Sequence, residues 1–302
     1  MLNLYSTPCA TLPDLNHTAT DEDEVNYQPL LINHEIVHLP SMTAIATQRQ
    51  ALKGRKSAPK TLAVLADPVF SADDPRLQGK SLNAENDLNF SLDESALQRA
   101  ANNLNREVWP RLPGTREEAK AILQMVSPQS SLQAFDFDAN FNWATKPDLS
   151  QYRYVHFATH GFADPKNPEL SGIVLSLFNQ AGEPERGYLR LGDIFNLNLP
   201  ADLVVLSACE TGLGGNINGE GLVGLTRGLM YAGAERLAVS LWKVDDNATA
   251  QLMQKFYQRM LQNGEAPNVA LRQAQLQMWE QKEDKWRNPY FWSGFIVQGE
   301  WR

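Results

Sequence analysis

A cysteine at the end of an apolar run is the first residue in this sequence that could act as a nucleophile. It lies in DLVVLSACETGLGG, residues 202–215, where the run 203–206 predicts a strand buried on both faces of a parallel sheet. Cys209 follows two small residues, at the position where α/β folds place reacting groups. A buried structural cysteine explains this stretch alone equally well, because such cysteines are common.

A second stretch, YRYVHFATHGFAD at residues 152–164, offers the base that a cysteine nucleophile needs. It predicts another strand, which ends at His160 and is followed by Gly161. A base can come from a distant part of the chain, so these two strands can bring the imidazole and the thiol of Cys209 to one edge of a sheet. The backbone N–H groups of Gly161 and Cys209 would then converge on an oxyanion, and Gly161 has no side chain to block the approach.

Other chemistries fit these residues less well. His156, His160 and Cys209 fall short of the four ligands that a structural zinc site usually needs, so we expect no metal and place His156 inside a strand, facing a helix layer. The run GLGGNINGEG lacks the Lys-Ser/Thr of a phosphate loop, and we expect a mobile loop beside the site. No G-x-S-x-G elbow indicates a serine hydrolase. Asp164 lies near His160, but a role in a turn explains it at least as well.

The two stretches resemble a known pair of motifs. HFATHG and LSACETG are similar to the paired motifs of the CHAT domain, a caspase-like cysteine peptidase module often found behind TPR repeats. The resemblance covers the last two thirds of the chain strongly and the first third loosely. It continues in LPGTREEA (112–119), GEGLVGLTRGLMYAGA (219–234), SLWKVDDNAT (240–249) and NPYFWSGFIVQGEW (288–301).

The resemblance implies a cysteine endopeptidase that acts on a protein or peptide substrate. Cys209 would attack the scissile carbonyl, His160 would manage the proton, and the N–H groups of Gly161 and Cys209 would hold the oxyanion. The family is typically a switched effector, so we expect regulation by a TPR-type domain or partner. The alternative is a catalytically silent CHAT signalling or scaffold module, which would not require all three of Cys, His and Gly.

One more motif suggests what the site cleaves after. SLWKVDD at 240–246 is similar to the LW-x-V-x-D motif of separases, distant relatives in the caspase-like clan, where the final Asp lines a pocket for a basic side chain. The resemblance implies that Asp246, with its neighbour Asp245, favours Arg or Lys before the scissile bond. The structural alternative is that Asp246 is the N-cap of a helix over 247–262.

Composition and charge limit the partners. The net charge of -8 argues against nucleic acid and against an anionic membrane surface, and no apolar run approaches the length of a bilayer span. The N-terminus lacks a basic start and a long apolar core, so we expect no secretory signal. The two cysteines, Cys9 and Cys209, do not indicate a disulfide scaffold, and we expect a reducing, cytoplasmic compartment. The expected chemistry needs no cofactor.

The order of predicted elements indicates the fold. Residues 1–28 are expected to be an N-terminal linker or frayed segment, and 29–302 the CHAT domain; no repeat of the TPR period is present. Alternating strands and helices predict a three-layer α/β/α sandwich with a mostly parallel central sheet, which the resemblance makes caspase-like. Thr115 and Glu118 predict a capping box at a helix start. Gly221, Gly224 and Gly228 share one face of a helix over 221–231, which we expect to pack against the sheet. Strands are expected at 61–66, 131–137 and 235–242 and near 291–299, with a hairpin over 171–191 and further helices near 93–104, 247–262 and 267–281.

Overall fold

The computed structural model describes residues 28–77, 88–103, 109–164, 167–210, 220–242, 244–281 and 283–301. The chain divides into two compact units, Met1–His34 and Glu35–Arg302. The described part of the first unit contains the 3-10 turn η1 (Leu30–Ile32). The predicted linker, residues 1–28, lies almost wholly outside the described residues, and its boundary stays a prediction.

A mostly parallel sheet forms the centre of the second unit. Residues 62–66 of β1 are all fully buried, and a strand without a polar face needs helices on both sides. The strand order is β2-β1-β3-β6-β7-β8, and all these neighbours are parallel except β7 and β8. The sequence predicted the hairpin of β4 and β5. The structure adds that β4 pairs antiparallel with the end of β3. The strands are β1 (Lys60–Pro68), β2 (Ser131–Asp136), β3 (Tyr152–Phe162), β4 (Gly172–Val174), β5 (Tyr188–Arg190), β6 (Leu203–Glu210), β7 (Arg236–Ser240) and β8 (Phe295–Gly299).

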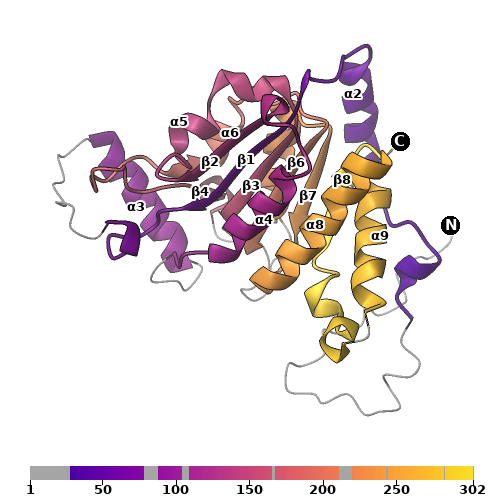
Figure 1. Cartoon of the computed structure of the whole chain (residues 1–302). Helices are drawn as coiled ribbons and strands as arrows, with labels where there is room; N and C mark the ends of the chain where they lie inside the picture. Colours follow the sequence, from indigo (N-terminus) through magenta and orange to yellow (C-terminus); the bar gives the residue numbers. More distant parts are fainter. Residues whose placement is uncertain are drawn as a thin grey trace. The chain divides into compact units, whose positions relative to one another are not determined.

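Helices cover both faces of the sheet and complete the three-layer α/β/α sandwich. Figure 1 shows α4, α8 and α9 together on one face, while α5, α6 and α7 contribute to the core on the other. The helices are α2 (Met42–Leu52), α3 (Leu88–Asn103), α4 (Pro113–Leu123), α5 (Phe141–Ala144), α6 (Leu191–Ile194), α7 (Glu220–Tyr231), α8 (Asp246–Asn263) and α9 (Pro267–Trp279). Further 3-10 turns are η2 (Pro75–Leu77), η3 (Pro128–Ser130), η4 (Pro147–Gln151), η5 (Pro168–Leu170), η6 (Asp284–Arg287) and η7 (Pro289–Phe291).

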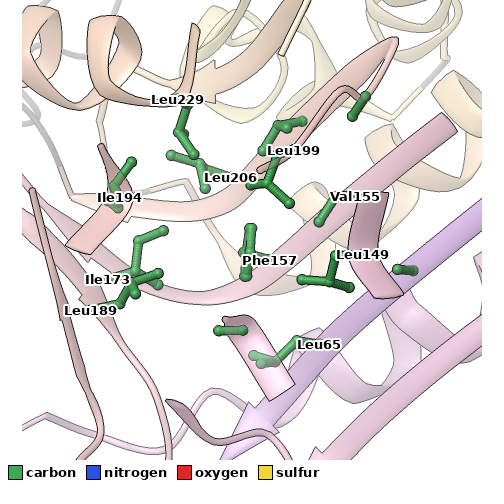
Figure 2. Packing of buried hydrophobic residues seen from close by; sticks show 14 of the residues in the cluster. Leu65, Leu149, Val155, Phe157, Ile173, Leu189, Ile194, Leu199, Leu206 and Leu229 are labelled. Carbon is green, nitrogen blue, oxygen red and sulfur yellow. The ribbon is translucent and has the colours of Figure 1, made fainter. Parts of the chain in front are cut away.

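A hydrophobic cluster holds β3 beside β6 under α5, α6 and α7. Figure 2 shows Phe157 of β3 between Leu65 of β1 and Leu206 of β6. Trp143 of α5 meets the ring of Phe157 edge-on, with the centroids 6.4 Å apart. Burying an apolar side chain of this size contributes about 1.5–3 kcal/mol. This packing fixes the two strands that carry the predicted dyad against each other.

The start of α4 differs from the sequence prediction. Thr115 and Glu118 do not form a capping box, because α4 begins at Pro113, where proline's missing amide leaves no donor to satisfy. The Thr115 hydroxyl donates to the carbonyl of Leu112 at 2.7 Å, and Glu118 lies buried beside His156 instead. Glu118 therefore serves the tertiary structure, whereas Thr115 contacts the N-cap residue and also accepts from the Asp67 amide at 3.1 Å.

The glycine face of α7 also differs from its prediction. It packs against α6 and not against the sheet. A Cβ on Gly228 would lie 2.9 Å from Leu191 Cδ1 and 3.2 Å from Ile194 Cγ2, while one on Gly224 would lie 3.5 Å from Leu191 Cδ2. The glycines permit this close helix contact because they have no side chain.

Candidate active site

The two strands that carry the predicted dyad are direct neighbours. β3 and β6 run parallel, and their register pairs Gly161 with Cys209. Further back, Phe157 pairs with Leu206, so β3 has one residue more than β6 between these two pairs. The extra residue is a β-bulge, which re-aims the side chains after it and is frequent beside active sites. His160 pairs with Ala208 and Gly161 with Cys209, so the fold brings the backbones of His160 and Cys209 within one residue of the same level at the carboxyl ends of adjacent strands.

His160 lies among aromatic rings at the end of β3. The residue is 2 % exposed, and the ring centroids of Phe70 and Trp109 lie 4.9 and 5.3 Å from that of the imidazole. Trp109 also packs on Phe162, with the centroids 5.1 Å apart. These aromatic residues belong to a small buried cluster with side chains of α3. They restrict rotation of the imidazole and exclude water from its sides.

A backbone carbonyl orients the imidazole. Nε2 of His160 lies 2.7 Å from the carbonyl oxygen of Pro110. A carbonyl can only accept, so Nε2 carries the hydrogen and Nδ1 is the nitrogen that can gain or lose a proton. Sequence reasoning missed Pro110, because a contact made by the main chain has no residue signature. The only available signal was that the matched stretch LPGTREEA begins two residues after it.

The Gly161 backbone has strand neighbours on both sides. It pairs with Cys209 of β6 and, antiparallel, with Ile173 of β4. An oxyanion site at this point needs N–H groups that are not used up by the sheet. The assignment of the Gly161 and Cys209 N–H groups to an oxyanion hole stays a prediction.

The Cys209 side chain lies outside the described residues, as do residues 211–219, which contain most of the glycine-rich run expected to form a loop beside the site. The structure therefore gives the backbone position of Cys209 in β6 and its strand partner. The placement of the thiol relative to the imidazole stays a prediction.

Asp164 serves a turn beyond the end of β3. Its carboxylate accepts from the Asn167 amide at 2.9 Å and from the Asn103 side chain at 2.7 Å, and its own amide donates to Ser171 Oγ at 3.0 Å. The residue is fully buried. These partners support the turn role that the sequence left open.

His156 belongs to a separate buried cluster. Its Nδ1 lies 3.0 Å from the Tyr257 hydroxyl, and its Nε2 lies 2.9 Å from Oε1 of Glu118, in a close contact that lacks hydrogen-bond alignment. All three residues are at most 1 % exposed. Burial, together with the Glu118 and Tyr154 side chains, raises the pKa of Tyr257, so its hydroxyl stays protonated. As the sequence predicted, His156 faces the helix layer, between α4 and α8.

The two acidic residues of the predicted pocket take different positions. Asp245 is the N-cap of α8, because its side chain accepts from the Ala248 amide at 3.0 Å. The alternative that Asp246 caps the helix is therefore wrong; Asp246 is the first helical residue and is exposed. Its Cβ would lie 2.7 Å from a Cβ on Gly114, at the start of α4. Gly114 is four residues from Pro110, so Asp246 lies beside the segment that covers His160.

A hollow of about 390 Å³ lies elsewhere, between α5 and α6. It contains none of the predicted site residues. Among its lining residues, Arg186 lies over the Phe141 ring at 3.9 Å and pairs with Asp193 at 2.9 Å. Two of its charged lining residues, Arg186 and Asp193, are thus paired with each other, and Lys146 is a third charged residue of the lining.

A three-layer sandwich in which adjacent parallel strands carry His-Gly and Cys at one level is the arrangement that the motifs imply. The chain belongs to the CHAT domain family, because the family model of the CHAT domain matches residues 2–300. It is similar to tetratricopeptide repeat protein 28 of Homo sapiens, at 26% identity over 225 residues, which is 65% of this chain and 9% of that protein. The protein of the same name from Mus musculus is 26% identical over 231 residues, again 65% of this chain and 9% of that protein. The chain spans a small part of the length of these relatives.

Among the residues that the structure describes, no helix is both long and apolar enough to cross a membrane.

Proposed function

We propose that this CHAT domain is a cysteine endopeptidase that hydrolyses peptide bonds with a Cys209–His160 dyad. The observation that carries the proposal is the register of β3 and β6, in which Cys209 is the strand partner of the residue after His160. His160 itself pairs with Ala208, so the two residues lie one step apart at the ends of adjacent strands, and the proposal requires the Cys209 side chain to turn toward the imidazole side of the sheet. The burial of His160 among aromatic rings favours a defined proton-transfer geometry over a solvent-exposed histidine.

His160 would act through Nδ1. Because Nε2 donates to the Pro110 carbonyl, the neutral ring offers its lone pair at Nδ1, where it can accept the thiol proton of Cys209. The same carbonyl stabilises the imidazolium that forms, since it lies along the Nε2–H bond. The resulting thiolate is the nucleophile.

The reaction would proceed in two steps. The Cys209 sulfur attacks the scissile carbonyl carbon, and the tetrahedral intermediate collapses as Nδ1 of His160 gives its proton to the leaving amine nitrogen. A thioester on Cys209 remains. Water then attacks the thioester while Nδ1 takes a proton from it, and the thiol is regenerated with release of the carboxylic acid.

The proposed specificity is for a basic residue before the cut. Asp245 caps α8, but the Asp246 carboxylate is exposed beside the start of α4. That position lies near the segment over His160, so its negative charge would attract an Arg or Lys side chain of a bound peptide. The alternative role of Asp246, as the N-cap of α8, is wrong, because Asp245 caps that helix.

The relatives suggest how the activity would be controlled. They are named as tetratricopeptide repeat proteins, and this chain matches 9% of their length. We propose that a TPR-type domain or partner regulates the peptidase. The proposed compartment is the cytoplasm, where the thiol stays reduced.

The test is mass spectrometry of a mixed peptide library after incubation with the wild type and with Cys209→Ala. Peptidase activity predicts new termini with the wild type and none with the variant, with Arg or Lys before the cuts. Labelling with limiting iodoacetamide is the second readout, and it should modify Cys209 before Cys9 if the dyad lowers the thiol pKa. Absence of both cleavage and preferential labelling would favour the silent scaffold module.

A further inference from the structure

A buried aspartate ends the first strand of the sheet and binds three arginines. Asp67 is fully buried and has a φ of 50°, in the left-handed region. Its carboxylate accepts from Nε and Nη2 of Arg111 at 2.9 and 2.7 Å and from Nε of Arg116 at 2.7 Å. Nη1 of Arg76 lies 3.3 Å away. A buried carboxylate persists only where such partners replace water.

A second aspartate, at the end of the neighbouring strand β2, joins the network, and buried Asp74 is a third, which accepts from Nε and Nη2 of Arg76 at 2.8 and 2.6 Å. Asp136 has a φ of 53° and accepts from Nη1 of Arg76 at 2.7 Å and from Arg116. Burial by itself would raise the pKa of Asp136, but hydrogen bonds and the charges of Arg76 and Arg116 lower it. Arg76 and Arg116 thus bridge both strand ends, whereas Arg111 extends from Asp67 to another part of the chain.

Arg111 connects the network to His160. It directly follows Pro110, whose carbonyl oxygen lies 2.7 Å from Nε2 of His160. The segment 109–115 is held again at its other end, because the Asp67 amide donates to Thr115 Oγ1 at 3.1 Å. Asp67 therefore binds both Arg111 and Thr115 of the segment 109–115, whose Pro110 carbonyl orients the imidazole.

A further contact comes from the turn that Asp67 begins. Val69 follows it after Pro68, and its amide donates to Ser176 Oγ at 3.0 Å. Phe70 then reaches the imidazole, with the ring centroids 4.9 Å apart. Trp109, from the segment beside Arg111, contacts the same ring. The surroundings of His160 thus come from two segments that meet at Asp67.

We propose that Asp67 is a positioning residue for His160, which it orients through the bidentate pair with Arg111 and the Pro110 carbonyl. Asp67 does not touch the reacting atoms. Its effect is to fix which imidazole nitrogen carries the hydrogen and the direction in which the other nitrogen points. The inference rests on the proposed dyad for its catalytic consequence, but the orientation itself can be measured without any turnover.

Arg111→Gln is the decisive variant. It removes the arm toward Pro110 and leaves Arg76 and Arg116 to neutralise the buried carboxylate. Arg153→Gln is the matched control, since Arg153 pairs with Asp202 at 2.8 Å and its side chain is 43% exposed, against 38% for Arg111. Asp67→Asn is the second test, used where circular dichroism and the Tm show that it folds.

The first readout is NMR of the protein labelled with 15N-histidine, with the His160 signal assigned from His160→Gln. The wild type and Arg153→Gln should show one tautomer, with hydrogen on Nε2 and slow exchange of that hydrogen. Arg111→Gln should show mixed tautomers, with hydrogen exchange faster by about tenfold or more. An unchanged His160 signal in a folded Arg111→Gln protein would overturn the proposal.

The second readout is the kinetics on a peptide that the wild type cleaves. Misplacing a catalytic group by about 1 Å can lower the rate about 100-fold, so kcat of Arg111→Gln should fall by about 10- to 100-fold with KM nearly unchanged. Loss of the tautomer signal with kcat unaltered would contradict the link to catalysis. A tautomer change in Arg111→Gln, in a protein whose wild type cleaves no peptide, would refute the peptidase function while supporting the positioning role.

Discussion

The Cβ of Asp246 occupies the space next to Gly114, so that a Cβ added to Gly114 would lie only 2.7 Å from it. The starts of α8 and α4 are therefore in direct contact. Because Gly114 belongs to the segment 109–115, whose Pro110 carbonyl contacts His160, this contact places the exposed Asp246 beside that segment. The helix-capping role belongs to the preceding residue, Asp245. Stability and substrate choice should thus depend on different aspartates.

Substitution of each aspartate should separate the two roles. Asp245→Ala removes the cap of α8 and should destabilise the protein by about 1 kcal/mol, with little change in cleavage preference. Asp246→Asn should leave the Tm nearly unchanged but selectively weaken cleavage after Arg and Lys, because the charge is lost and the shape is kept. Urea unfolding and peptide-library profiling measure the two effects. A wild-type profile without preference for basic residues would end the pocket hypothesis.

Substitution of the two histidines of β3 should likewise separate an effect on turnover from an effect on stability. His160→Ala should remove most of the turnover, and the loss should not add to that of Cys209→Ala, because the two residues act as one unit. His156→Ala leaves Glu118 and Tyr257 buried without their partner and should lower stability by about 1–3 kcal/mol. Kinetics and denaturant titration of both variants check this. Full loss of activity in a folded His156→Ala protein, with His160→Ala active, would reverse the assignment.

Glu185 should make stability depend on pH. Burial, with a smaller effect of Asp138, raises the pKa of Glu185 from 4.5 to about 7. The fold therefore favours the protonated form, and this contribution to stability is complete below pH 4.5 and is lost as the pH rises through about 7. Glu185→Gln lacks the ionisation, so its stability relative to the wild type should be higher at about pH 8 than at about pH 4.5. Urea titrations at both pH values measure the difference, and equal differences would contradict the assignment.

The contact between α7 and α6 should tolerate no added methyl group at Gly228. A Cβ there would lie 2.9 Å from Leu191 and 3.2 Å from Ile194, so Gly228→Ala should destabilise the protein by about 1–3 kcal/mol despite alanine's higher helix propensity. Gly224→Ala is the matched control, because its Cβ would meet Leu191 at an ordinary 3.5 Å. Thermal unfolding of both variants is the measurement. A Gly228→Ala protein as stable as Gly224→Ala would show that α6 and α7 can move apart without loss of stability.

The periodicity of apolar residues was sufficient to predict most of the fold. The apolar runs that end at Asp67 and before Cys209 have no polar face, which is why buried parallel strands were the right prediction. Helix ends were less predictable. Both Asp245 and Asp246 have the chemistry of an N-cap, and the choice between them depends on where the chain leaves β7.

For the candidate site, the sequence could indicate the strands that carry His160 and Cys209, whereas the contacts around them depend on the tertiary structure. The β-bulge of β3 changes the register by one residue, and none of the residues in ATHG is a sequence signal for a bulge. The Pro110 carbonyl is a main-chain group, and the partners of Asp67 come from three separate segments around Arg76, Arg111 and Arg116. These features depend on contacts between distant parts of the chain, which a single sequence does not encode in a readable pattern.

The buried cluster of Glu118, His156 and Tyr257 has a consequence for motion. It joins the middle of α4, β3 and α8 by polar contacts in an otherwise apolar layer. Sliding α4 along α8 by one turn, about 5.4 Å, would separate these groups and leave each of them buried alone. The cluster therefore resists sliding of α4 along α8. A shift of the start of α8 is therefore expected to move α4, and with it the segment over His160.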